Sequence, residues 1–239
     1  MYDSLFPIYD SLSPGDATTV QERVYQSLRL ALLRGQFLPG DQVSIRGLAN
    51  AFGTSPMPVR EAVKRLVAEK GLEQSSDRLI RVSPYIGSVH EEYIRIRIQV
   101  EGFATERACR ISNPQLVDRL RSFNQNMLTA SQSNDMETAL ISNQSFHFEI
   151  YRAAHYPQLL DIISNLWLRT GPFLATAQRN PELFERVFAT GFEMHDRAVE
   201  AFARHDRAEA RRAIALDIRS AHFWIRKYYE ANNFSMNIV

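Results

Sequence analysis

The sequence has almost no cysteine and no long apolar run. Cys109 is the single cysteine among 239 residues, which excludes an internal disulfide framework and a cysteine-rich zinc module and fits a reducing compartment. No stretch approaches the roughly 18 apolar residues that a membrane-spanning helix needs. The first 18 residues carry three Asp and neither Lys nor Arg, unlike a signal peptide. We therefore expect a cytoplasmic globular protein with no membrane partner and a flexible tail over residues 1–17.

The chain also lacks a surplus of charge of either sign. It holds 28 Lys and Arg against 27 Asp and Glu, a balance that, taken over the whole chain, argues against binding to nucleic acid. Residues 18–85, however, hold ten basic against six acidic side chains, whereas residues 86–239 hold 18 of each. The basic surplus is confined to one small segment, where a DNA-binding surface would be expected.

Helical periodicity is strong in this segment. Residues 20–33 repeat apolar side chains at helical spacing, and a second short helix is expected after Ser44, whose hydroxyl can cap it. A third helix is expected to begin at Pro56 or Pro58, because proline costs little in the first turn of a helix. Gly71 is expected to end it.

A polar turn between two short extended segments follows over residues 72–82. Three helices and a small hairpin predict a winged helix-turn-helix over residues 18–83, with the third helix in the major groove. Arg60, near the start of that helix, can offer a bidentate hydrogen bond to guanine. The alternative for Arg60 is a surface ion pair with an acidic neighbour such as Glu61.

The rest of the chain reads as helical throughout. After a linker at 84–88, an all-α antiparallel bundle of about six helices is predicted over residues 89–231, followed by a tail at 232–239. The fold class is therefore mainly α, with the β structure restricted to the wing. The expected helices cover 89–111, 114–131, 135–154, 157–175, 181–203 and 207–230.

Four polar residues of the second half can meet inside the bundle. Asn143 and His147 are four residues apart and share one helix face. His195 and Asp217 are equidistant from the break at Asp206, about 16 Å on each side at 1.5 Å per residue, so an antiparallel hairpin brings them level. The spacing therefore predicts one cluster built from three helices.

Two imidazoles and a carboxylate form a plausible facial ligand set for zinc, nickel, iron or manganese. His222 is an alternative to Asp217 as the ligand from the last helix. The two residues are five apart, so their side chains point in directions about 140° apart around the helix axis and cannot share one cavity. The alternative is that these groups are buried polar residues hydrogen-bonded to one another.

One arginine of the second half is expected in the interior. Arg97 either pairs with Glu101, one turn later, or binds an anionic ligand, because a buried guanidinium needs a partner. His90, His155 and His205 fall in expected linkers or turns, and no specific role is expected for them.

Short motifs punctuate the N-terminal segment: Gly35, Leu38-Pro39-Gly40-Asp41, Leu48-Ala49, Phe52-Gly53, Pro58 to Leu66, and Gly71-Leu72. In the second half follow Arg97 with Glu101, Asn143 with Phe146-His147, and His195. From residue 18 to about 225 the chain resembles the GntR family of bacterial transcription regulators, in its FadR-like branch with an all-helical, FCD-type C-terminal domain.

The resemblance implies a ligand-responsive regulator rather than an enzyme. Such a protein is expected to be a homodimeric repressor that binds a pseudo-palindromic operator in double-stranded DNA and is modulated by a small carboxylate effector. The implied DNA-binding residues are Arg46, Ser55, Met57, Arg60, Lys64, Arg78 and Arg81. The implied effector-binding residues are Arg97, Asn143, His147, His195 and Asp217.

The chain departs from the family pattern at several positions. Pro56 stands where the family commonly has an arginine, and Ser76-Asp77 stands at the wing tip where a glycine is usual. Metal-binding members usually hold Asp, His, His and His where this chain has Asn143, His147, His195 and Asp217, so the resemblance implies these four residues as the predicted metal ligands. Two alternatives remain open: a metal-dependent enzyme that uses His147, His195 and Asp217, and a metal sensor whose effector is the ion itself.

Overall fold

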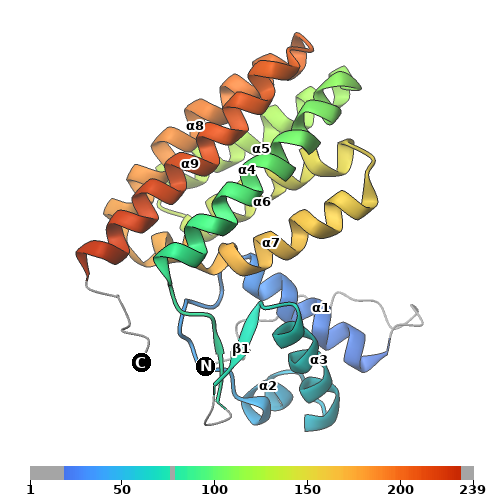
Figure 1. Ribbon diagram of the computed structural model, residues 1–239, viewed down its shortest axis with the longest axis vertical. Helices are drawn as coiled ribbons and strands as arrows, with labels where there is room; N and C mark the ends of the chain where they lie inside the picture. Colours follow the sequence, from blue (N-terminus) through green and yellow to red (C-terminus); the bar gives the residue numbers. More distant parts are fainter. Residues whose placement is uncertain (1–18, 76–78, 233–239) are drawn as a thin grey trace. The chain divides into compact units, whose positions relative to one another are not determined.

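The computed structural model describes residues 19–75 and 79–232 (Figure 1). The chain divides into two compact units, one made of residues 1–84 with 167–175 and the other of residues 85–166 with 176–239. The expected tail over 1–17, the wing-tip residues Ser76-Asp77, the predicted DNA contact Arg78 and the tail from residue 233 onward lie outside the described residues. The domain boundaries expected from the sequence stay predictions.

Over residues 19–75 and 79–84, the first unit forms three helices and a two-stranded antiparallel hairpin. Leu72 pairs with Val82 and Gln74 with Ile80 across the hairpin, and an isolated bridge joins Gln42 to Arg81 beside it. This is the predicted winged helix-turn-helix. The elements are α1 (Val20–Leu33), α2 (Ile45–Ala51), α3 (Pro56–Ala68), β1 (Leu72–Gln74) and β2 (Ile80–Val82).

The helix ends follow local side-chain chemistry. Ser44 caps α2 as expected, because its hydroxyl accepts the backbone N–H of Gly47 at 3.2 Å. Helix α3 begins at Pro56, the earlier of the two prolines. It ends at Ala68 rather than at Gly71, since Lys70 with φ of 60° takes the left-handed position that closes the helix.

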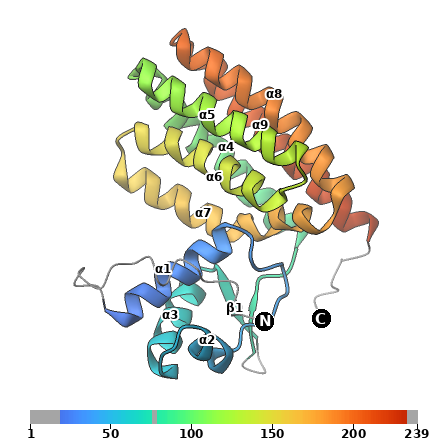
Figure 2. The same cartoon turned by 180° about the vertical axis from the view of Figure 1, so that it is seen from behind.

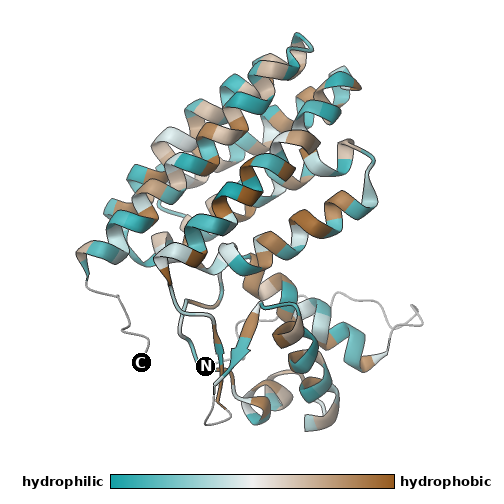
Figure 3. Ribbon diagram, in the orientation of Figure 1, coloured by the Kyte–Doolittle hydropathy of each residue, from teal (hydrophilic) through white to brown (hydrophobic). Residues whose placement is uncertain are grey.

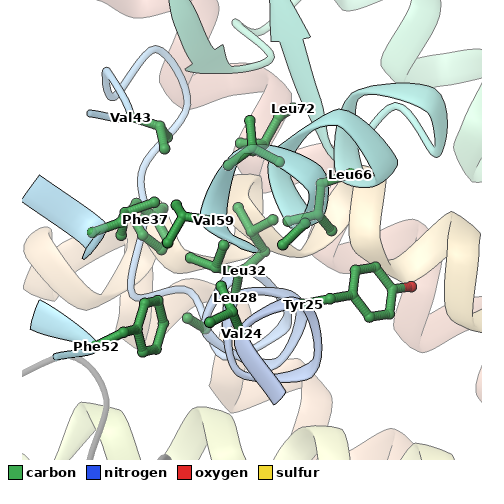
Figure 4. Close-up of a cluster of buried hydrophobic side chains, with 14 of the residues drawn as sticks. Val24, Tyr25, Leu28, Leu32, Phe37, Val43, Phe52, Val59, Leu66 and Leu72 are labelled. Carbon is green, nitrogen blue, oxygen red and sulfur yellow. The ribbon is translucent and has the colours of Figure 1, made fainter. Parts of the chain in front are cut away.

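A single apolar cluster holds the first unit together (Figure 4). Leu28 of α1, Leu48 of α2 and Val59 of α3 are each at most 2% exposed. Leu72 and Val82, which pair in the hairpin, extend the cluster to the wing. Because one face of α3 is buried in this cluster, the side chains on its opposite face are exposed to solvent.

The second unit is built from long helices. Their order is α4 (Gly87–Arg110), α5 (Pro114–Gln132), α6 (Met136–Ala153), α7 (Pro157–Ala175), a 3-10 turn η1 (Thr176–Arg179), α8 (Pro181–Ala203) and α9 (Arg207–Ala231). The prediction of a mainly α chain is confirmed. Helix α4 begins at Gly87, so the last two residues of the expected 84–88 linker are helical, and residues 167–175 of α7 group with the first unit.

The bundle helices pack in a regular pattern. Helix α9 lies between α8 and α4, and α5 packs on both α6 and α8 (Figures 1 and 2). Most helices change between polar and apolar colour along their length (Figure 3), the mark of one buried and one exposed face. Among the described helices, none is apolar over a length that would cross a bilayer. The predicted polar cluster lies on the inward faces of α6, α8 and α9.

Candidate functional site

Three of the four predicted metal ligands meet in the interior of the second unit. His147 comes from α6, His195 from α8 and Asp217 from α9. Their nearest ligand atoms all lie within 4.8 Å of one another. His147 is 1% and His195 0% exposed, and Asp217 is 8% exposed. We call these three residues the His-His-Asp group.

The spacing of the atoms suits a shared cation. The two Nε2 atoms of His147 and His195 are 3.2 Å apart, and Nε2 of His147 lies 3.1 Å from Oδ2 of Asp217. Ligands about 2.0–2.1 Å from one ion at tetrahedral or octahedral angles lie roughly 2.9–3.4 Å apart. His195 Nε2 is 3.9 Å from Asp217 Oδ1, slightly longer than that. The donor set therefore fits a divalent metal that accepts imidazole and carboxylate ligands.

Asn143 and Gly191 flank the His-His-Asp group on two helices. Asn143 is buried on α6 one turn before His147, which is the predicted helix face, and its role as a ligand stays a prediction. Gly191 stands one turn before His195 on α8, and a Cβ there would lie 3.4 Å from Oδ1 of Asp217. The absent side chain leaves room for the Asp217 carboxylate. The sequence did not indicate a role for Gly191, because its closeness to Asp217 on α9 depends on how the helices pack.

Burial controls the charge of these groups. Burial lowers the pKa of His195 to about 3, against the opposing effect of Asp217, so its imidazole is neutral and able to bind a cation. Burial alone would raise the pKa of Asp217, but the hydrogen bond to His147 and the nearby imidazoles and Arg97 hold it below its ordinary value. The Asp217 carboxylate is thus held ionised beside the two imidazoles in a water-poor interior.

The His195 ring is held by packing rather than by polar contacts. It stacks on Phe146 with ring centroids 3.9 Å apart and an interplanar angle of 8°. Its Nδ1 is buried and has no hydrogen-bond partner among the described residues. An aromatic face therefore fixes the direction of its Nε2 atom.

The His147 ring, by contrast, is the end of a chain of hydrogen bonds. Its Nδ1 lies 3.1 Å from the hydroxyl oxygen of Tyr151, and that hydroxyl donates to Glu101 Oε2. Glu101 in turn accepts from Arg97, with Nε at 2.5 Å from Oε1 and Nη2 at 3.3 Å from Oε2. Burial and Glu101 together raise the pKa of Tyr151 well above its ordinary value, so it stays protonated.

Of the two roles considered for Arg97, the structure contains the ion pair with Glu101, and binding of an anion stays a prediction. Glu101 is completely buried and Arg97 is 11% exposed at its side chain. Tyr151 was not among the predicted site residues. Tyr151 lies four residues after His147 on the same helix, and this spacing could have predicted that the two side chains are neighbours.

A second histidine pair lies near the start of α4, and it corrects the expectation for His90. His90 is not in a linker: it is 2% exposed within α4, and its Nδ1 lies 3.0 Å from Nδ1 of His222 on α9. Nε2 of His222 lies 2.6 Å from Glu91 Oε2. His222 is thus occupied away from Asp217, as the rotation between the two positions requires.

The other two histidines end helices. His155 and His205 have φ of 54° and 55°, the left-handed positions that follow α6 and α8. The expectation that they lie in turns is confirmed. Nδ1 of His205 also lies 3.2 Å from the carbonyl oxygen of Cys109, so His205 has a structural contact that was not expected.

The exposed face of α3 carries the predicted DNA contacts. Met57, Arg60 and Lys64 are exposed at spacings of three and four residues, so they lie on one side of the helix. Ser55, which precedes α3, and Arg46 on α2 are exposed as well. Met57 leaves 65% of its surface in solvent, an unusual exposure for a large apolar side chain.

The predicted DNA-binding residues of α3 and the wing differ in whether they form an ion pair. The alternative proposed for Arg60 is not found, because Glu61 pairs instead with Lys64 at 2.8 Å. Arg81 pairs with Glu73 across the hairpin at 2.7 Å. The ion pairs found among the described residues of this segment do not include Arg60 or Arg46. Both guanidinium groups are therefore available to an outside anion.

Two protein families match separate ranges of the chain. The family described as bacterial regulatory proteins, gntR family, matches residues 20–82, and the FCD domain matches residues 92–220. The first range covers α1 to β2, and the second contains all three residues of the His-His-Asp group.

Individual proteins agree with these matches. The chain is 31% identical over 169 residues to the HTH-type transcriptional regulator McbR of Escherichia coli, covering 69% of this chain and 76% of that protein. It is 28% identical over 192 residues to the gluconate operon transcriptional repressor of Bacillus subtilis, covering 78% and 76%. The solved structure of E. coli McbR/YncC superposes with a TM-score of 0.80 at 26% identity, covering 89% of this chain and 99% of that one.

Proposed function

The chain belongs to the GntR family of bacterial transcription regulators, with a gntR-type DNA-binding domain and an FCD domain, and from this premise we propose that it is a homodimeric repressor controlled by a divalent cation and a small organic acid. The matched families and relatives are regulators of transcription and not enzymes. The His-His-Asp group is the observation that carries the effector part of the proposal.

Binding to DNA is assigned to the exposed face of α3 and to the wing. Arg60 would read a base edge through its two parallel N–H groups, while Arg46, Lys64 and Arg81 would bind phosphates and set the register. The ion pairs of Lys64 and Arg81 are on the surface. Such pairs are worth little, about 0–1 kcal/mol, so phosphates can replace the carboxylates. A repressor role is supported by the relative named as the gluconate operon repressor.

Effector binding is assigned to the second unit. His147, His195 and Asp217 would hold the cation, with Asn143 as a further oxygen ligand. A divalent cation there would supply a charged centre for the carboxylate of an organic acid. Arg97, already paired with Glu101, is a second cationic group for the same acid, since a guanidinium binds carboxylates in a bidentate way.

An operator-binding titration tests this proposal. Operator affinity is measured by fluorescence anisotropy for the chelator-treated protein, for the protein with zinc alone, and for the protein with zinc plus a panel of small carboxylates. A shift of affinity that needs both components supports a metal-bridged acid, because an effector moves an equilibrium only by its differential affinity for the two states.

The same titration decides the second candidate function. A shift caused by zinc alone supports a metal sensor instead. The variants His147→Ala and His195→Ala provide the control, since each removes one imidazole ligand and should abolish any response that depends on the cation. A response that persists in both variants would overturn the assignment of the effector site to the His-His-Asp group.

A further inference from the structure

We propose that Tyr151 is a positioning residue that fixes the orientation and proton position of His147, so that His147 presents Nε2 to a cation in the His-His-Asp group. This inference rests on the proposed metal site and adds to it a residue that supports a ligand without being one. Polar partners behind metal-binding histidines commonly set which ring nitrogen faces the metal.

The direction of the hydrogen bonds begins at Glu101. Its carboxylate is fully buried and forms two contacts with the Arg97 guanidinium, so it is ionised and can only accept hydrogen bonds. The hydroxyl of Tyr151 reaches Glu101 Oε2. The single proton of that hydroxyl is therefore donated to Glu101.

The proton of His147 follows from this direction. Because the Tyr151 proton is already used, the hydroxyl oxygen can act toward Nδ1 of His147, 3.1 Å away, only as an acceptor. Nδ1 must then carry a proton. Nε2 is left to face Asp217 Oδ2 at 3.1 Å and His195 Nε2 at 3.2 Å. A cation that binds there would take the Nε2 lone pair, and the proton that joins Nε2 to Asp217 would be released to solvent.

Water cannot take the place of this hydroxyl without rearrangement. Tyr151 is 1% and His147 1% exposed, and Tyr151 stands one turn after His147 on α6, with Glu101 contributed by α4. The two imidazoles are thus held by different means: Phe146 stacks on His195, whereas the hydrogen bond from His147 to Tyr151 orients the other ring. Only the second arrangement depends on one phenolic oxygen.

The test compares two matched variants of the full chain. Tyr151→Phe removes the hydroxyl that faces His147, and Tyr229→Phe removes another buried hydroxyl, which lies 2.9 Å from Thr176 Oγ1 and away from the His-His-Asp group. Zinc affinity is measured by calorimetry, and the melting temperature of the metal-free protein is measured alongside. We expect Tyr151→Phe to weaken zinc binding by about 10–100-fold, whereas Tyr229→Phe lowers only the melting temperature.

Two outcomes would overturn the role of Tyr151. One is wild-type zinc affinity in Tyr151→Phe, and the other is an equal loss in both variants, which would indicate general destabilisation. If wild-type protein takes up no zinc at all, the proposed metal site itself fails and this inference with it.

A measurement on wild-type protein covers the case in which Tyr151→Phe does not fold. Nitrogen-proton correlation spectra of the zinc-loaded protein with labelled histidine should show His147 protonated at Nδ1 and bound through Nε2. Binding through Nδ1 would contradict the proposal, since the proton that the Tyr151 oxygen requires would be missing.

Discussion

Two buried imidazoles in direct contact make His90 a sensitive point of the fold. Nε2 of His222 lies 2.6 Å from Oε2 of Glu91, and the Nδ1 atoms of His222 and His90 lie 3.0 Å apart. Burial, with His222 and Arg97 acting in the same direction and Glu91 opposing, lowers the pKa of His90 from 6.5 to about 3. His90 is neutral in the folded protein at every pH near neutrality.

This neutral histidine predicts acid sensitivity. Between pH 6.5 and about pH 3, His90 is protonated in the unfolded chain but neutral in the folded protein. The free energy of unfolding therefore falls as the pH is lowered through this range. The slope from one such group approaches about 1.4 kcal/mol per pH unit. His90→Gln should flatten the pH dependence of metal-free protein in urea unfolding by that amount.

His155→Asn is the matched control for His90→Gln. His155 is exposed and its φ of 54° suits asparagine, so this change removes a histidine without removing a buried one. Equal slopes in the two variants would show that His90 titrates normally in the folded protein.

At the scale of elements, α3 has two faces with different tasks. Val59, Val63 and Leu66 are at most 1% exposed and join the core. Arg65 is exposed but is held against other side chains of the unit: its guanidinium lies 3.6 Å from the Tyr25 ring centroid and pairs with Glu22 and Glu69. The outward face that bears Arg60 and Lys64 is therefore the part of α3 that can enter a groove.

Substitution of Arg60 should separate recognition from stability. Arg60→Ala is expected to weaken operator binding by about 1–3 kcal/mol and to relax sequence preference, because a bidentate contact to a base is lost. Anisotropy titrations with operator and scrambled duplexes measure both effects. Arg65→Ala is the control on the same helix, and it should lower the melting temperature while keeping the ratio of the two affinities. An unchanged ratio in Arg60→Ala would contradict the assignment.

At the scale of the whole molecule, the near-zero net charge is the sum of two segments with different charge balances. The chain has a formal charge of +1, yet residues 18–85 hold four more basic than acidic side chains and residues 86–239 are balanced. Affinity for DNA is therefore limited in each chain and would be increased by pairing two such segments in a dimer.

Salt dependence measures that pairing. Each phosphate contact contributes about 0.9 to the slope of log affinity against log salt concentration. If Lys64 contacts one phosphate per chain, Lys64→Ala should reduce the slope by about 1.8 for a dimer and about 0.9 for a monomer. The smaller change would contradict binding as a dimer, and no change would contradict the phosphate contact.

The elements and their order follow from local properties of the sequence. Helical periodicity, caps such as Ser44 and the breaks at Pro114, Pro157 and Pro181 are local properties of the chain, and the observed helices begin within about two residues of their expected positions. The antiparallel hairpin about Asp206 likewise brought His195 and Asp217 together, since helix rise is the same in any sequence.

Which side chains of distant helices face one another depends on how the helices pack. Tyr151 contacts Glu101, 50 residues away in the sequence, and His90 contacts His222, 132 residues away. Helical periodicity is a local pattern, so it cannot predict contacts between residues so far apart in the sequence. Whether a polar side chain is buried with a partner depends on how α4, α6 and α9 rotate about their axes, and the packing of all their apolar side chains sets that rotation together.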